Sequence, residues 1–385
     1  MTGWAIVLQW SRLGISAAVF LLAARLLPLA EIGTFATAFA LPRLLQVIHK
    51  SGITELRITA DTPDRPLWHL SLLLGLAAAG LCLSALPLLP PEALGHAAAL
   101  ALMPLLHGLA APSEGALRRA LKIRQLALRT CAAQGIAALV ALAALAQGFG
   151  AGALTGFALI HALLSAGLSL ALAPPQLAAR GPIRPLLPEL TRLTLRPLAA
   201  TATFPAVQLL VGLTLGLPAA GAFQIATRLV ELIDTLALAP LRYLALPRFK
   251  SLAGTGGFAA KLAQANRRVA VLTAVIYPAA WLAAPLVLPL LGPDKAQAAL
   301  PLLPPLLLTG AISALLMPLT QALVATGHSA LPLYRTALAF TFSLLLLVPV
   351  LSHPLALWVL PLASGIAALP FLRAARRRLP SGVPA

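Results

Sequence analysis

Apolar residues follow one another along this chain in runs that are long enough to cross a lipid bilayer. A transmembrane helix needs about 20 predominantly apolar residues, and internal prolines do not exclude one because membrane helices tolerate kinks. We predict about twelve such spans. Their approximate cores are 5–28, 33–51, 67–90, 94–114, 126–147, 150–173, 197–217, 219–246, 268–291, 298–325, 328–351 and 354–372.

The composition agrees with this pattern. Of 385 residues, 60% are hydrophobic and only 10% are charged, whereas a soluble domain carries about 25% charged residues. The predicted fold class is therefore all-α, a polytopic membrane protein of about twelve transmembrane helices.

The basic residues indicate how the spans are oriented. Nearly every Lys or Arg between spans falls in alternate connections, and Lys295 is the exception. By the positive-inside rule these connections and both termini lie in the cytoplasm. The same distribution accounts for the net charge of +18, so we predict no nucleic-acid partner.

A proline-rich, basic segment divides the spans into two sets of six. We predict an N-terminal lobe at 1–173, a cytoplasmic linker at 174–196, and a C-terminal lobe with a basic cytoplasmic tail at 197–385. "EIGTFATAFALPRLLQ" aligns with "AAGAFQIATRLVELID", which pairs Gly33 with Gly221, and "LRTCA" at 128–132 resembles "YRTAL" at 334–338. Because each half has an even number of spans, the two lobes form a parallel pseudo-symmetric repeat.

The connections are too short to fold as a catalytic domain. The sequence contains no HExxH, GxSxG, Walker A or paired CxxC motif, and no His or Cys cluster with metal-ligand spacing. We therefore predict that the protein is not an enzyme and has no metal site or cofactor.

Charged residues lie inside the span at 219–246. A charge at the centre of a span costs about 2.5–3.5 kcal/mol, so it normally faces the protein interior or a hydrated cavity. Gln224, Arg228 and Glu231 share one side of this helix, and Asp234 lies at its edge. The stripe is typical of a helix that lines a cavity. The alternative is that Arg228 and Glu231 only pair with each other at i,i+3.

Two further arginines lie in the first two spans. Arg43 is near the middle of its span and aligns with Glu231 in the internal repeat, and Arg25 either reaches a cavity or snorkels to the outer face. The planar guanidinium group is suited to phosphate, so the predicted ligand is an anion such as a diphosphate. The predicted substrate-binding residues are Arg228, Arg43, Arg25 and Gln224, and the ion-coupling candidates are Glu231 and Asp234.

Several segments resemble a known family. "ARLLPLAEIGTFATAFAL" and "GLTLGLPAAGAFQIATRL…PLRYLALPRF" are similar to passages of polysaccharide flippases, among them O-antigen flippases, of the multidrug/oligosaccharidyl-lipid/polysaccharide exporter superfamily. The resemblance implies a two-lobed fold that flips undecaprenyl-diphosphate-linked oligosaccharide across the bacterial inner membrane. Carried over by position, Arg25 and Arg228 match recurrent arginines of that family, whereas Ile32 replaces the usual aromatic residue.

Other functions remain open at this point. A drug or organic-cation antiporter of the same superfamily would be favoured by acidic residues near the middle of the membrane in the first half of the chain, and the sequence has none there. A membrane-embedded glycan polymerase or acyltransferase would need a long outer loop or a buried His–Asp site. A scaffold in a glycan-assembly complex, in contact with a glycan polymerase or glycosyltransferases, is a further alternative. The partners that we predict are a lipid-linked oligosaccharide and membrane lipid.

Overall fold

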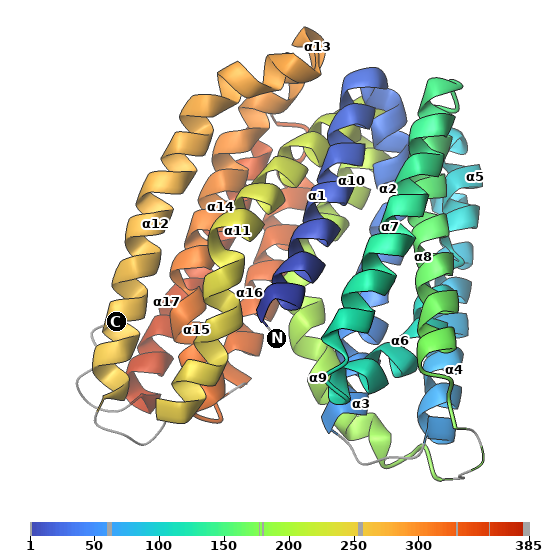
Figure 1. Ribbon diagram of the computed structural model, residues 1–385. Helices are drawn as coiled ribbons and strands as arrows, with labels where there is room; N and C mark the ends of the chain where they lie inside the picture. Colours follow the sequence, from blue (N-terminus) through green and yellow to red (C-terminus); the bar gives the residue numbers. More distant parts are fainter. Residues whose placement is uncertain are drawn as a thin grey trace. The chain divides into compact units, whose positions relative to one another are not determined.

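The computed structural model describes residues 2–59, 64–176, 178, 181–252, 257–328, 330–353 and 355–379. Within these ranges the chain is helical and contains no strand (Figure 1). The first part contains α1 (Thr2–Leu26), α2 (Leu29–Val47), the π-helical turn η1 (Ile48–Ile53), α3 (Thr54–Thr59), α4 (Asp64–Ser84), η2 (Leu86–Leu88), α5 (Pro91–Leu100), α6 (Met103–Arg119), α7 (Ile123–Ala146), α8 (Ala151–Leu172), α9 (Leu186–Thr201) and α10 (Thr203–Thr214). It is followed by α11 (Leu217–Leu252), α12 (Phe258–Val287), η3 (Leu288–Leu291), α13 (Pro293–Ala299), η4 (Leu300–Leu302), α14 (Leu303–Leu315), α15 (Met317–Ala325), α16 (Ala330–Leu347), η5 (Val348–Val350), η6 (Ala356–Trp358) and α17 (Val359–Arg378).

The twelve predicted spans fall on these helices. Eight helical segments of the described chain are long and apolar enough to cross a membrane, and the bent pair α9–α10 raises the number to as many as nine. α2 and α11 are not among them; they are the helices on which the sequence places Arg43 and Arg228. The predicted all-α membrane fold is confirmed.

The bend between α9 and α10 has a local cause. The two helices meet at 51°. Pro205 lies in the first turn of α10, and because it has no N–H group it leaves the carbonyl of Thr201 without its usual helical partner. The chain therefore changes direction at this point.

The segment predicted as a linker is partly helical. α9 begins at Leu186 and buries Leu186, Leu190 and Thr194, which are four residues apart and so share one face. This face packs on η1, where a Cβ atom at Gly52 would lie 2.2 Å from Thr194 Oγ1. The prolines and charges of this segment suggested a linker, whereas its apolar period of four residues builds a helix.

By its internal contacts the described chain divides into two units, Met1–Gly221 and Ala222–Ala385. In the first unit α1 packs on α7, α7 on α8, and α4 on α6. Small residues of these two helices, such as Ala23 of α1 and Ala127 and Ala133 of α7, are fully buried. Small side chains let membrane helices approach closely, which strengthens their packing.

α2 and the first turn of α11 also approach closely within this unit. A Cβ atom at Gly33 would lie 1.7 Å from the carbonyl oxygen of Leu217, and one at Gly221 would lie 2.0 Å from the carbonyl oxygen of Leu29. Each glycine therefore meets the main chain four residues before the other glycine. This reciprocal contact joins the two positions that the internal alignment paired, and it supports the repeat; the predicted lobe boundaries stay a prediction.

The second unit has its own apolar core. Phe249, Phe258, Leu262 and Phe371 belong to one cluster of buried residues, and the rings of Phe249 and Phe258 are 5.8 Å apart. α16 packs on α17, and α12 packs on α14 and α15. The core therefore holds α11, α12 and α17 together near the ends of α11 and α17.

A second correspondence between the halves involves two arginines. Arg129 of α7 and Arg335 of α16 occupy equivalent places in "LRTCA" and "YRTAL". Arg129 donates a hydrogen bond to Ser169 of α8, and the Arg335 guanidinium lies 5.5 Å from the ring centre of Phe371 of α17. Each arginine thus contacts the helix that follows its own, as a repeated fold requires.

Candidate substrate-binding site

The polar stripe of α11 contains an ion pair. Arg228 Nη1 lies 3.2 Å from Glu231 Oε2, and the side chains remain 21% and 23% exposed. The i,i+3 pairing is therefore present, but neither group is sealed from its surroundings. A partly exposed pair leaves room for a ligand to compete for the guanidinium group.

α12 contributes a partner to the same stripe. Tyr277 Oη donates a 2.9 Å hydrogen bond to Asp234 Oδ1, and the tyrosine is 5% exposed. Gly310 of α14 makes room for the ring, since a Cβ atom there would lie 2.9 Å from Tyr277 Cε1. The sequence analysis missed Tyr277; the signal was a tyrosine in an apolar span of a chain that has only 3.

The remaining polar groups of α11 differ in their burial and in their hydrogen bonds. Gln224 is buried, with 8% exposure. The hydroxyls of Thr227 and Thr235 donate to carbonyls of their own helix, Phe223 at 2.9 Å and Glu231 at 2.7 Å. These two hydroxyls are therefore occupied within the helix, whereas Asp234 is bonded to Tyr277 of α12.

Arg25 and Arg43 belong to the unit Met1–Gly221. Arg43 is half-buried on α2, and about two turns further, in η1, Lys50 Nζ donates a 2.7 Å hydrogen bond to Gln46 Oε1. Arg25 is exposed in the last turn of α1, where a cation is favoured by the helix dipole. On α11, Arg228 is paired with Glu231, and the roles assigned to all six residues stay predictions.

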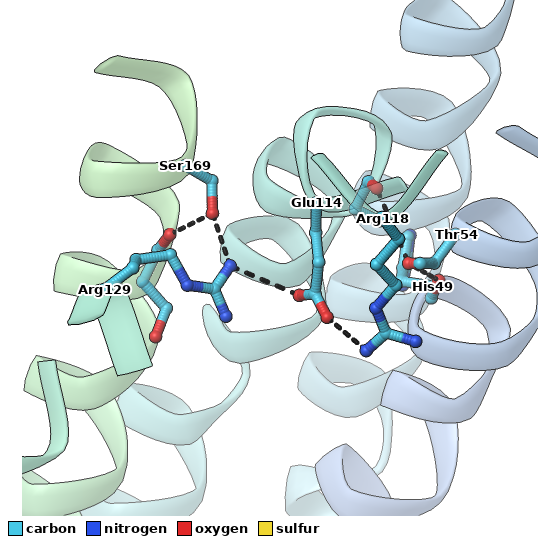
Figure 2. Close-up of polar contacts among 8 residues, drawn as sticks. His49, Thr54, Glu114, Arg118, Arg129 and Ser169 are labelled. Carbon is cyan, nitrogen blue, oxygen red and sulfur yellow. Dashed lines mark hydrogen bonds and ion pairs between the residues drawn. The ribbon is translucent and has the colours of Figure 1, made fainter. Parts of the chain in front are cut away.

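Figure 2 shows a second charged cluster, which the sequence analysis missed. Glu114 of α6 lies 2.5 Å from Arg118 and 3.3 Å from Arg129 of α7. Arg129 also donates to Ser169 Oγ of α8 at 2.6 Å, and that hydroxyl donates to the carbonyl of Ser165. The Arg129 side chain is only 8% exposed.

A buried charge is costly unless it is paired and hydrogen-bonded. The cluster supplies both conditions for Arg129 and connects α6, α7 and α8 within one unit. Its partners come from three helices, so only the i,i+4 pair of Glu114 and Arg118 was visible in the sequence. We assign this cluster to helix packing.

The buried histidines are also bonded to the main chain. His49 Nε2 lies 3.2 Å from the carbonyl of Ser71, and His107 Nδ1 lies 2.7 Å from the carbonyl of Met103. Beside His49, the Thr54 hydroxyl donates to the His49 carbonyl at 3.1 Å (Figure 2). In the described part of the chain no three His, Cys, Asp or Glu residues are placed to hold a metal ion.

Comparison with protein families shows which family the chain belongs to. The profile of a family described as "Polysaccharide biosynthesis protein" matches residues 22–295, more than half of the chain. The chain belongs to this family. All predicted substrate-binding and ion-coupling residues of the chain, and Tyr277, fall inside the matched range. A search of curated protein sequences finds no match.

Solved structures show which fold this polysaccharide biosynthesis protein has. It is similar to a lipid II flippase MurJ in an inward closed conformation, with a TM-score of 0.80, 13% identity, and coverage of 98% of this chain and 88% of that one. It is also similar to an inward-facing multidrug resistance MATE family transporter of the MOP superfamily, with a TM-score of 0.73, 16% identity, and coverage of 96% and 94%.

A third structure is a MOP superfamily transporter from Pyrococcus furiosus, with a TM-score of 0.59, 16% identity, and coverage of 97% and 95%. The three structures match nearly the whole chain, so this polysaccharide biosynthesis protein has the MOP superfamily fold.

Proposed function

We propose that the protein flips undecaprenyl-diphosphate-linked oligosaccharide across the bacterial inner membrane by alternating access. The charged headgroup crosses through the protein while the lipid tail stays in the bilayer. The family match supports a role in polysaccharide biosynthesis, and a lipid II flippase shares the fold. Both termini are cytoplasmic in this proposal, as the distribution of basic residues predicts.

The observation that carries the proposal is the position of Arg228. The Arg228 side chain lies on a largely apolar helix, is only 21% exposed, and its Nη1 atom lies 3.2 Å from the Glu231 carboxylate. A diphosphate carries more charge than a carboxylate and accepts two parallel hydrogen bonds from one guanidinium group. We propose that the diphosphate displaces Glu231 from Arg228, and that Arg43, Arg25 and Gln224 contribute to its binding.

The carboxylates supply a means of coupling. When the substrate takes Arg228, Glu231 loses this ion pair, and the loss of a cation beside a carboxylate in a membrane protein favours uptake of a proton or a cation by the carboxylate. Asp234 is tied to Tyr277 at 2.9 Å. We propose Glu231 and Asp234 as the residues that take up the coupling ion.

The pathway follows from the substrate. A flippase for a lipid-linked repeat unit serves O-antigen, lipopolysaccharide or exopolysaccharide assembly, and its partners are the glycosyltransferases that build the unit and the polymerase that joins the units. Deletion of the gene is expected to leave the lipid-linked intermediate on the inner leaflet, where it is measured by extraction and accessibility to a membrane-impermeant reagent.

The direct test is transport in proteoliposomes. We expect Arg228→Ala to abolish flipping of the lipid-linked oligosaccharide and Arg228→Lys to restore only part of it, because lysine lacks the planar fork. The matched control is Arg192→Ala on α9, which removes another i,i+3 Arg–Glu pair, bonded at 2.7 Å with a 70% exposed arginine. Wild-type flipping by Arg228→Ala would refute the role of this residue.

The same assay separates the main alternative. An organic-cation antiporter would move a cationic dye in exchange for protons and would leave the lipid-linked oligosaccharide on one leaflet. If the wild-type protein transports the dye but does not flip the lipid-linked oligosaccharide, its function is drug export and the proposed function is wrong.

A further inference from the structure

A cavity of about 860 Å³ opens at one end of the unit Met1–Gly221. It is lined by the starts of α2 and α5, the α7–α8 connection, the end of α10 and the start of α11. The α1–α2 and α7–α8 connections lie together at this end, away from α3 and α9 (Figure 1). These connections belong to the set that the positive-inside rule places outside the cell membrane, so the cavity faces the outer side.

Glu31 is the key polar residue of this cavity. It lies in the first turn of α2, it is half-buried, and its Oε2 atom is buried without a hydrogen-bond partner among the described residues. The carboxylate rests on Gly150, where a Cβ atom would lie 2.0 Å from Oε2 and where φ is 56°. Any other residue at 150 would be strained and would clash with this oxygen.

A buried carboxylate oxygen without a donor is unfavourable. The residues around it leave the oxygen pointing at the cavity wall formed by the α7–α8 connection. Glu31 also lines the cavity, so the same carboxylate group can accept a hydrogen bond from a ligand hydroxyl on its cavity side.

His96 supplies a second polar contact. Its Nδ1 lies 3.0 Å from the hydroxyl of Thr155, which holds the ring in one orientation. Nε2 makes no hydrogen bond with the described residues, and His96 lines the same cavity as Glu31. An imidazole held through one nitrogen can donate to or accept from a hydroxyl through the other.

Phe149 adds an apolar surface. It lies between Gly148 and Gly150 in the α7–α8 connection, lines the cavity, and is 64% exposed. The ring can stack on the C–H face of a pyranose while the polar groups bind its hydroxyls.

The lining also excludes other ligands. No Lys or Arg is among the described residues that line the cavity, whereas Glu31 and Glu92 are, so a diphosphate would be repelled. The described residues hold no group of three metal ligands, so a tightly bound metal ion is not favoured. The volume lies within the range of about 300–1,000 Å³ that is usual for small-molecule sites.

We propose that this cavity binds a neutral sugar of the oligosaccharide at the outer face, with Glu31 and His96 bonded to its hydroxyls and Phe149 stacked on its ring. The inference rests on the proposed function, because the glycan reaches this face only after the headgroup has crossed. Binding there would hold the glycan outside and favour release of the lipid carrier in that direction. The cavity is thus an exit site, separate from the diphosphate contacts of α11.

The test compares two substrates in proteoliposomes that contain the full chain. One is the lipid-linked oligosaccharide extracted from the host, and the other is the same lipid carrier with a diphosphate and one sugar. We expect Glu31→Gln and Phe149→Ala to slow flipping of the oligosaccharide by about tenfold, the factor that corresponds to about 1.4 kcal/mol. The short substrate, which has no distal sugar for the site, should move at the wild-type rate.

Two controls accompany these variants. Tyr334→Ala removes a ring that is also 64% exposed, on α16, and should change neither rate. Transport of the short substrate at the wild-type rate shows that a variant is folded. If Glu31→Gln and Phe149→Ala slow the flipping of both substrates equally, the exit site is refuted. It is also refuted if both variants flip the oligosaccharide at the wild-type rate.

A binding measurement is independent of transport. In Leu213→Cys the new thiol lines the cavity at a position that is 38% exposed in the wild type, and its labelling by an impermeant maleimide from outside reports occupancy. We expect the free oligosaccharide, released from its carrier, to protect this thiol, and Glu31→Gln to remove the protection.

Flipping and thiol protection together show whether the proposed function or the sugar site is wrong. Protection of Leu213→Cys without any flipping by the wild type would refute the proposed function and keep the sugar site. Flipping without protection would refute the sugar site and keep the flippase.

Discussion

The reciprocal contact of Gly33 and Gly221 leads to a quantitative prediction. A methyl group at residue 33 would meet the Leu217 carbonyl oxygen at 1.7 Å. The closest ordinary carbon–oxygen contact is about 3.3 Å, so the two helices must separate by roughly 1.6 Å. The obstructing atoms are main-chain carbonyls at 29 and 217, which cannot rotate away as a side chain would. Gly33→Ala and Gly221→Ala are therefore each expected to cost about 1–3 kcal/mol, the usual penalty of overpacking.

The double variant sharpens this prediction. Once the first methyl group has pushed the helices apart, the second finds most of its space already made, because a Cβ atom at Gly221 needs a similar displacement from its 2.0 Å contact. The free energy lost by Gly33→Ala/Gly221→Ala should therefore be well below the sum of the single variants. Two glycines at unrelated sites would show additive losses.

The assay is equilibrium unfolding of the purified protein in mixed micelles, with tryptophan fluorescence as the signal. Gly80→Ala on α4 and Gly167→Ala on α8 are the matched controls, since a Cβ atom at either position has no heavy atom within 4 Å. These controls should be neutral or stabilising because alanine favours a helix. Additive losses, or single variants as stable as the controls, would show that the helices do not cross here as described.

Further predictions concern the buried polar groups. Arg129→Ala should lower the free energy of unfolding by about 1–3 kcal/mol, because it removes the hydrogen bond to the buried Ser169 hydroxyl and leaves Glu114 with Arg118. Arg118→Ala should lower it by at most about 1 kcal/mol, since the Arg118 side chain is 36% exposed. Equal losses in the same unfolding assay would contradict the burial of Arg129. Tyr277→Phe should keep the fold but slow flipping at neutral pH, because Asp234 loses its 2.9 Å donor; an unchanged pH–rate profile would exclude Asp234 from coupling. Gly310→Ala, which presses a Cβ atom to 2.9 Å from Tyr277, should have the same effect on flipping without removing the hydroxyl, and a wild-type rate would contradict this.

The helices and their chemistry were readable from the chain because they depend on local properties. A bilayer leaves no water for backbone groups, so each apolar run of sufficient length becomes a helix whatever its neighbours are. The stripe of Arg228, Glu231 and Asp234 follows from the helical period, and so does the ion pair at i,i+3. α9 is the instructive exception, since its prolines and charges concealed an apolar face that shows only when Leu186, Leu190 and Thr194 pack on η1.

The sequence by itself determined a helical membrane protein with internally related halves and charges on one face of α11, because spacing along a helix sets all of these. Only the tertiary structure decided which groups from different helices meet: Tyr277 with Asp234, Arg129 with Glu114 and Ser169, and Glu31 with Gly150. Such contacts depend on how helices cross and rotate against one another. The crossing and rotation of the helices depend on the sum of many packing interactions, so they cannot be predicted from any single stretch of the chain.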